Sequence, residues 1–204
     1  MRIRITYSKT GALKYIGHLD LQTIWERAAR RAGLPLAYTH GFHPQAKIQH
    51  AAALPLGFSS RCEVVDLRLE TEVDLGDLPV RLQTAMPGGV QILKVESVAD
   101  QLPPLQTQVS AAEYEVELIA HDGLADLQDR IVGLLASPAL PRVRRGKAYD
   151  LRPLIEDLAI NSDGVIFMRL SAREAATGRP EEVLDALGLA SDLGRIERTR
   201  LIFQ

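Results

Sequence analysis

The sequence predicts an α+β protein made of two tandem ferredoxin-like halves, each with the element order βαββαβ. Stretches in which apolar and polar residues alternate, as in half-buried strands, are interspersed with stretches whose apolar residues recur at helical spacing. The order strand, helix, two strands, helix, strand occurs twice along the 204 residues. A proline-containing stretch of little periodicity lies between the two occurrences. We therefore expect domains at residues 1–98 and 112–204, joined by a linker at 99–111.

The first half opens with a strand at residues 2–8, because every second residue is apolar there. A helix at 18–32 follows, since one face of it is apolar through Leu21, Ile24, Trp25, Ala28 and Ala32. We expect Asp20 to cap its start and Gly33 to end it. The other elements expected in this half are strands at 47–53, 63–71 and 90–98 and a helix at 77–86.

The second half repeats this pattern without residue identity to the first. Pro180 suits the first turn of its second helix, since proline lacks an amide hydrogen that this position does not need. Its helices are expected at 124–135 and 180–187, and its strands at 114–120, 142–149, 165–171 and 195–203.

Composition excludes several classes of protein. With 46% hydrophobic and 25% charged residues, the chain is typical of a folded globular protein and unlike a disordered one. No apolar run approaches the roughly 18 residues that a membrane span needs, and the start does not resemble a signal peptide, so we expect a cytoplasmic protein without a membrane partner. A single cysteine, Cys62, excludes an internal disulfide, and we expect no cofactor and no metal.

Charge is distributed unevenly along the chain. Residues 1–50 carry eight Lys and Arg against Asp20 and Glu26, a formal charge of +6 in a chain whose net charge is −2. Four of the five histidines and six of the ten aromatic residues also precede residue 60. This concentration predicts a local binding surface.

His18 is the first candidate for chemistry, because it lies at the start of the predicted helix. The helix dipole favours a neutral imidazole there, and such a group can act as a base or donate to a phosphate. The alternative is that His18 and Asp20 only cap the helix.

The segment from His40 to Lys47 is the second candidate. Its glycine and proline favour a tight turn, from which Phe42 can stack on a ligand while His43 and Lys47 contact a phosphate. Two alternatives remain open, an ordinary hairpin connection and a metal site of His40, His43 and His50, whose spacing matches no standard zinc signature.

Basic residues complete the predicted surface. Arg27, Arg30 and Arg31 form a stripe on the polar side of the first helix, and a second cluster follows residue 141. On one strand, Arg142 and Arg144 would share a face opposite Arg145 and Lys147, which suits either nucleic-acid backbone contact or a charged edge that prevents aggregation. The predicted ligand- or nucleic-acid-binding residues are Lys9, Lys14, Tyr15, His18, Arg27, Arg30, Arg31, Phe42, His43, Lys47, Arg144, Arg145 and Lys147.

Short motifs along nearly the whole chain are also informative. They are Tyr7-Ser8-Lys9, His18-Leu19-Asp20, Arg27, Arg30–Pro35, Gly41–Pro44, Leu54–Gly57, Arg144–Lys147, Asp150–Ile155 and Arg179–Leu184. Together they resemble the radical-SAM-linked protein family, a bacterial family of unknown function. The resemblance implies a partner, a radical SAM protein with a cobalamin-binding-type domain.

One cysteine cannot supply the three thiolates of a radical SAM cluster, so this chain is not the radical enzyme itself. We expect a non-catalytic accessory module that binds RNA or another phosphate-bearing substrate through its basic N-terminal surface. One alternative is an RNA-cleaving or transferase enzyme with His18 as acid or base. Another is an adaptor that binds only the radical SAM partner.

Overall fold

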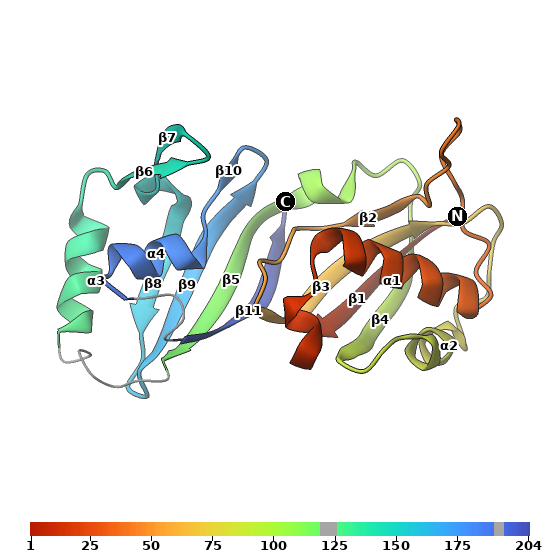
Figure 1. Ribbon diagram of the computed structural model, residues 1–204, viewed down its shortest axis with the longest axis horizontal. Helices are drawn as coiled ribbons and strands as arrows, with labels where there is room; N and C mark the ends of the chain where they lie inside the picture. Colours follow the sequence, from red (N-terminus) through yellow and green to blue (C-terminus); the bar gives the residue numbers. More distant parts are fainter. Residues whose placement is uncertain (119–125, 190–193) are drawn as a thin grey trace. The chain divides into compact units, whose positions relative to one another are not determined.

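The computed structural model describes residues 1–118, 126–189 and 194–204 (Figure 1). They divide into two compact units, Met1–Gln108 and Val109–Gln204. Each unit combines an antiparallel sheet with two α-helices, which confirms the predicted α+β class. None of the helices in these three ranges is long and apolar enough to cross a membrane.

The sheet of the first unit has its first strand in the middle. β1 pairs with β3 on one side and with β4 on the other, and β2 pairs with β3, giving the antiparallel order β4-β1-β3-β2. α1 follows the first strand and α2 the third. The bounds are β1 (Arg2–Lys9), α1 (His18–Arg31), β2 (Ile48–His50), β3 (Ser59–Arg68), α2 (Leu78–Ala85) and β4 (Val90–Val98).

The core of this unit lies between the sheet and its helices. Ile3, Ile5 and Tyr7 alternate along β1 as predicted and are fully buried. Trp25 of α1 is also fully buried, with its ring 4.8 Å from that of Tyr7 in an edge-on arrangement. Burial of aromatic side chains contributes strongly to stability, so this contact fixes α1 on the sheet.

Both ends of α1 can be compared with the prediction. Gly33 has a φ of +71°, and its amide and that of Leu34 donate to the carbonyls of Arg30 and Ala29, which ends the helix as expected. At the other end the prediction is wrong. The N-cap is Gly17, and Asp20 lies in the first turn without capping it, where its charge still favours the helix dipole.

Residues 99–108, expected as part of a linker, lie against the polar face of the first sheet. The guanidinium of Arg2 donates to the carbonyls of Leu102 and Pro103, at 2.8 and 3.1 Å. A short 3-10 helix, η2 (Leu105–Gln108), follows, and its Leu105 is fully buried. The segment therefore covers side chains of β1 that would otherwise face solvent.

The second unit repeats this strand order. β9 pairs with β5 and β8, and β5 pairs with β11, giving the antiparallel order β8-β9-β5-β11, while β10 extends β9 as a short hairpin. The bounds are β5 (Val109–Leu118), α3 (Leu127–Ala136), β8 (Ile155–Ile160), β9 (Val165–Arg173), β10 (Ala176–Thr177), α4 (Pro180–Ala186) and β11 (Gly194–Phe203). Residues 119–120 of the predicted strand and 124–125 of the predicted helix lie outside the described residues.

The strand predicted at 142–149 is wrong. This segment is a hairpin of β6 (Pro141–Arg144) and β7 (Lys147–Asp150), turning at Arg145 and Gly146. Both turn residues have positive φ, 50° and 76°, as a two-residue hairpin turn requires, and Gly146 adopts this conformation without strain. The second strand of the sheet is instead β8, which escaped prediction because its adjacent Glu156 and Asp157 interrupt the alternation.

Candidate functional site

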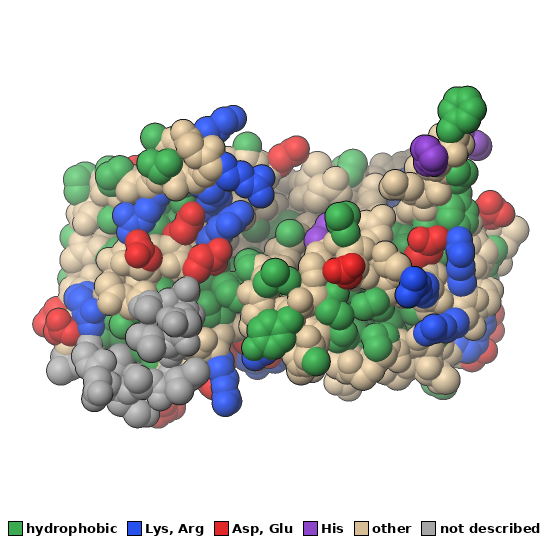
Figure 2. All heavy atoms as spheres, in the orientation of Figure 1, with side chains coloured by type: hydrophobic (Ala, Val, Ile, Leu, Met, Phe, Trp, Pro, Cys, Tyr) green, Lys and Arg blue, Asp and Glu red, His purple; other side chains and the backbone are tan. Residues whose placement is uncertain are grey.

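A projecting loop follows α1 in the first unit. The amide of Thr39 donates to the carbonyl of Gln45 at 2.9 Å, and the Gln45 amide donates to the Thr39 hydroxyl at 3.0 Å, which closes the base of the loop. At its tip Phe42 is fully exposed, and the neighbouring His40 and His43 are also exposed. We call residues 39–45 the Phe42 loop. Figure 2 shows a hydrophobic side chain beside histidines at a protruding corner of the molecule.

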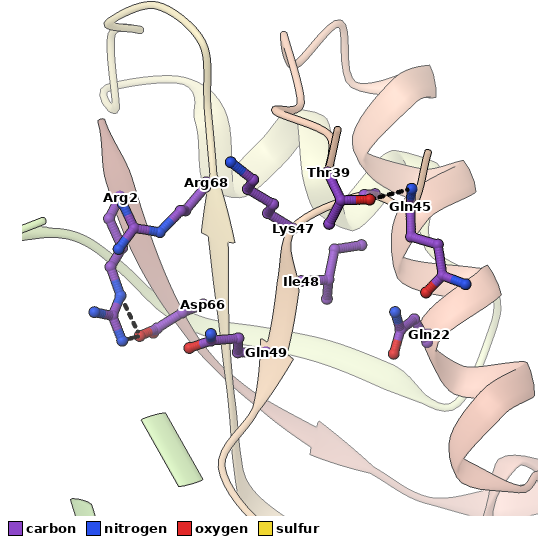
Figure 3. A pocket seen from close by; sticks show the side chains of 10 residues that line it. Arg2, Gln22, Thr39, Gln45, Lys47, Ile48, Gln49, Asp66 and Arg68 are labelled. Atoms are coloured by element: carbon purple, nitrogen blue, oxygen red, sulfur yellow. Dashed lines mark hydrogen bonds and ion pairs between the residues drawn. The ribbon is translucent and has the colours of Figure 1, made fainter. Parts of the chain in front are cut away.

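A pocket of about 280 Å³ lies beside the base of this loop. Its polar lining comes from β1, α1, the Phe42 loop, β2 with the preceding Lys47, and β3 (Figure 3). Gln22 and Gln45 lie on the α1 side, and Lys47 extends along the strand toward Arg68. Within the described part of the chain, no side chain or carbonyl pairs with the Lys47 ammonium. We call this cavity the Lys47 pocket.

The arginines at the pocket are held in ion pairs. Arg2 lies 2.6 Å from the carboxylate of Asp66, and Arg4 lies 2.9 Å from the other oxygen of that group. Arg2 and Asp66 are both 2% exposed, and Arg68 pairs with Asp100 at 3.3 Å. Among the described residues that line the pocket, Lys47 is therefore the cation without an ion pair, and its charge is available to an incoming anion.

The basic stripe of α1 is only partly available. Arg27 and Arg31 are exposed. Arg30 donates to the Tyr38 hydroxyl at 3.0 and 2.9 Å and lies 2.8 Å from Glu26, so its charge is shared with a local network. Two cations of the predicted stripe thus remain in solvent on this helix.

Lys9 does not lie on the predicted surface. It is 1% exposed, and its ammonium donates to the carbonyl of Ile16 at 3.2 Å. It follows Tyr7 by two residues in β1 and therefore occupies the buried side of the strand. Its assignment as a surface ligand is corrected accordingly.

His18 lies against another histidine. Its ring is exposed at the first residue of α1, 5.0 Å from the ring of His50 on β2, with an interplanar angle of 70°. His50 Nε2 is buried and has no hydrogen-bond partner among the described atoms. Burial, followed by the charges of His18 and Lys9, lowers the pKa of His50 to about 3. His50 is therefore neutral at physiological pH.

Lys14 and Tyr15 belong to a short 3-10 helix, η1 (Gly11–Tyr15), directly before α1. The Lys14 ammonium lies 5.0 Å from the centroid of the Tyr15 ring, and Tyr15 is 67% exposed. The carbonyl of Lys14 accepts from the amide of Gly57, which holds this turn in place. Both side chains are available at the surface near His18.

The candidates of the second half have different surroundings. Arg144 pairs with Glu182 at the start of α4 and donates to the Tyr149 hydroxyl at 3.0 Å. Burial, aided by Glu182, raises the pKa of Tyr149 to about 12. Arg144 thus ties the β6–β7 hairpin to α4, whereas Arg145 and Lys147 at the hairpin turn are exposed.

The histidines considered for a metal site are separated by their surroundings, since His40 and His43 lie on the Phe42 loop and His50 lies against His18. Across the described ranges, no three His, Cys, Asp or Glu side chains are grouped to hold a metal ion.

Sequence reasoning missed Gln22 and considered His50 only as a metal ligand, not as a group beside His18. Gln22 lies one helical turn after His18, on the same side of α1, and lines the pocket. His50 follows Ile48 by two residues in β2, which places both on one face of that strand. The helical and strand periods could have suggested both relations, but only the fold brings α1 beside β2.

Comparisons with known proteins give the following. A family model described as an uncharacterized protein conserved in bacteria, DUF2344, matches residues 2–180. No curated protein matches the chain. A chain in the crystal structure of a Cbf5–Nop10–Gar1 complex is similar, with a TM-score of 0.46 and 11% identity. That alignment covers 98% of this chain and 48% of the other, so this chain spans about half the length of its match.

Proposed function

This chain belongs to the bacterial family DUF2344, and we propose that it is an accessory module that binds single-stranded RNA. The proposed surface is the Phe42 loop together with the Lys47 pocket and the exposed arginines of α1. The observation that carries the proposal is Phe42, a phenyl ring held wholly in solvent at the tip of a loop whose base lines the Lys47 pocket.

Exposed aromatic rings beside cations suit single-stranded RNA. Unstacked bases stack on such rings, and neighbouring lysines and arginines bind the backbone. Here Phe42 offers the ring, Lys47 an unpaired ammonium, and Arg27 and Arg31 further exposed charge. The amides of Gln22 and Gln45 in the pocket add donors and acceptors for a base edge.

The histidine pair favours binding over turnover. A general acid or base works best with a pKa near the operating pH, and His50 lies well below that range. His18 is paired with this neutral ring, and His43 is exposed on the Phe42 loop. The enzyme alternative therefore rests on His18 alone.

We further propose that each unit is a ferredoxin-like domain. In support, both units place the first strand between the third and fourth, with the second at the edge. Both also have a helix after the first strand and another after the third. This arrangement is that of a split βαβ unit.

The proposed partner is a radical SAM protein with a cobalamin-binding-type domain, in the bacterial cytoplasm. This part of the proposal rests on the resemblance of the motifs given above.

The test is a fluorescence-anisotropy titration of labelled single-stranded RNA at two salt concentrations. Phe42→Ala is compared with Phe42→Tyr, which keeps an aromatic face, and with Val80→Ala, which trims an exposed side chain on α2. Loss of one stacked base is worth about 1–3 kcal/mol, so Phe42→Ala should weaken binding roughly 5- to 150-fold. Lys47→Ala should reduce the slope of log K against log salt by about 0.7, the value for one phosphate of a single strand.

The two control variants should bind RNA as the wild type does. The proposal is wrong if the wild type does not bind RNA, or if Phe42→Ala and Val80→Ala bind it equally well. If Phe42→Ala instead weakens binding to the purified radical SAM protein while no RNA binds, the chain is a protein adaptor. RNA turnover that is lost in His18→Gln while binding persists would establish the enzyme alternative.

A further inference from the structure

His50 presents a buried nitrogen that the fold leaves unused. Its Nε2 is out of contact with solvent and has no hydrogen-bond partner among the described residues. Buried polar atoms in native proteins are nearly always satisfied, so an unsatisfied one calls for an explanation. The ring beside it, that of His18, is exposed and stands edge to face at 5.0 Å.

Lys9 is one of the charged groups around this pair. Its buried ammonium lies close enough for its charge to act on His50, and it donates to the carbonyl of Ile16 just before α1. Within the described ranges, no third His, Cys, Asp or Glu is grouped with these two rings to complete a metal site. An imidazole N–H can donate a hydrogen bond to an oxyanion. The chemistry therefore favours an anionic oxygen ligand.

The pair is also aligned with the Lys47 pocket. On α1, His18 and Gln22 are four residues apart, which is about 6 Å along the helix axis. On β2, His50 and Ile48 are two residues apart, about 6.6 Å along the strand. Gln22 and Ile48 both line the pocket, and α1 packs beside β2. The pocket and the histidine pair are thus neighbouring positions along one α1–β2 seam.

We propose that His18 and His50 form a phosphate-binding subsite at the end of this seam. The inference rests on the proposed function in that the phosphate is taken to belong to RNA bound at the Phe42 loop. A free phosphate compound carries the same chemistry, and the experiment separates the two sources.

The experiment follows histidine ring resonances by NMR in the full chain with labelled histidine. Inorganic phosphate is titrated first, followed by RNA oligonucleotides with a terminal phosphate and the same oligonucleotides with a terminal hydroxyl. The His18 and His50 rings should shift saturably with phosphate, while His40 on the Phe42 loop serves as an internal control. His18→Gln should weaken phosphate binding about tenfold, the effect of one lost hydrogen bond to a charged group.

Trp25 fluorescence verifies that each variant is folded, and His18→Gln changes an exposed side chain, so the test does not depend on altering the buried His50. Tighter binding of the phosphate-terminated oligonucleotide, lost in His18→Gln, would identify the end of an RNA strand as the source. If only inorganic phosphate shifts the rings, the subsite serves a small phosphate compound.

The subsite is overturned if phosphate leaves both rings unshifted in the wild type, or if it shifts the His50 ring equally in wild type and His18→Gln. The proposed function survives that result as long as RNA binding still depends on Phe42. Conversely, shifts with phosphate in a chain that binds no RNA would keep the subsite and remove the proposed function.

Discussion

Replacing His50 should change how the stability of the first unit depends on pH. The unfolded chain holds this histidine at an ordinary pKa of about 6.5, whereas the folded chain lowers it to about 3. Below pH 6.5 the unfolded state therefore takes up a proton that the folded state does not, and the free energy of unfolding falls as the pH falls. Integrated between pH 7.5 and 5.0, the loss due to His50 is about 2 kcal/mol.

His50→Gln removes this contribution and keeps a neutral polar side chain. Urea unfolding followed by fluorescence is a suitable assay, because Trp25 is the single tryptophan of the chain and lies in the core of the first unit. The difference in unfolding free energy between wild type and His50→Gln should shift by about 2 kcal/mol over this pH range. His43→Gln is the matched control, since it removes an exposed histidine of the Phe42 loop.

The reasoning is refuted if the difference between wild type and His50→Gln stays constant from pH 7.5 to 5.0. It is equally refuted if the ring resonance of His50 titrates with a midpoint near its ordinary value. If the pH dependence instead disappears in His43→Gln, the effect belongs to His43 and not to His50.

Three further predictions concern stability and ionisation. Asp66→Asn leaves two arginines without their shared carboxylate and should lower the free energy of unfolding of the first unit by about 3–5 kcal/mol. An unchanged midpoint of urea unfolding would contradict the buried ion pair. Gly89→Ala places a methyl group 2.7 Å from a backbone carbonyl at a φ of +96°, and it should lower the free energy of unfolding by about 1–3 kcal/mol. In the control Gly88→Ala the added methyl group meets nothing within 4 Å, so the loss should be under about 0.5 kcal/mol. Equal midpoints for the two alanine variants would argue against this strain. Glu182→Gln should lower the pKa of Tyr149 from about 12, seen in the ultraviolet absorbance of tyrosinate, and no movement would exclude their coupling.

Local sequence patterns predicted the secondary structure correctly where apolar residues recur at one regular spacing. The alternation in β1 and the glycine after α1 predicted a strand and a helix end that the structure contains. Lys9 shows how the chemical type of a residue can mislead where the pattern is correct. Its position two residues after Tyr7 indicated the buried side of β1, but its charge suggested the surface.

Long-range packing accounts for what sequence could not supply. Nothing local indicates that Arg2 is buried by carbonyls about a hundred residues away, or that residues 99–108 cover a sheet face. The contact between His18 and His50 likewise depends on the seating of α1 beside β2. Binding groups that converge from distant segments therefore become visible only in the folded chain.

The two units differ most where the chain passes from the first helix to the second strand. In the first unit this connection carries the exposed Phe42 loop, and in the second it carries the β6–β7 hairpin, which Arg144 fastens to α4. A connection that leads to an edge strand can be lengthened or exchanged while the register of the inner strands is kept. The same strand order thus carries a projecting loop in the first unit and a hairpin fixed to a helix in the second. Binding specificity can therefore change at this connection while the residues of the core stay the same.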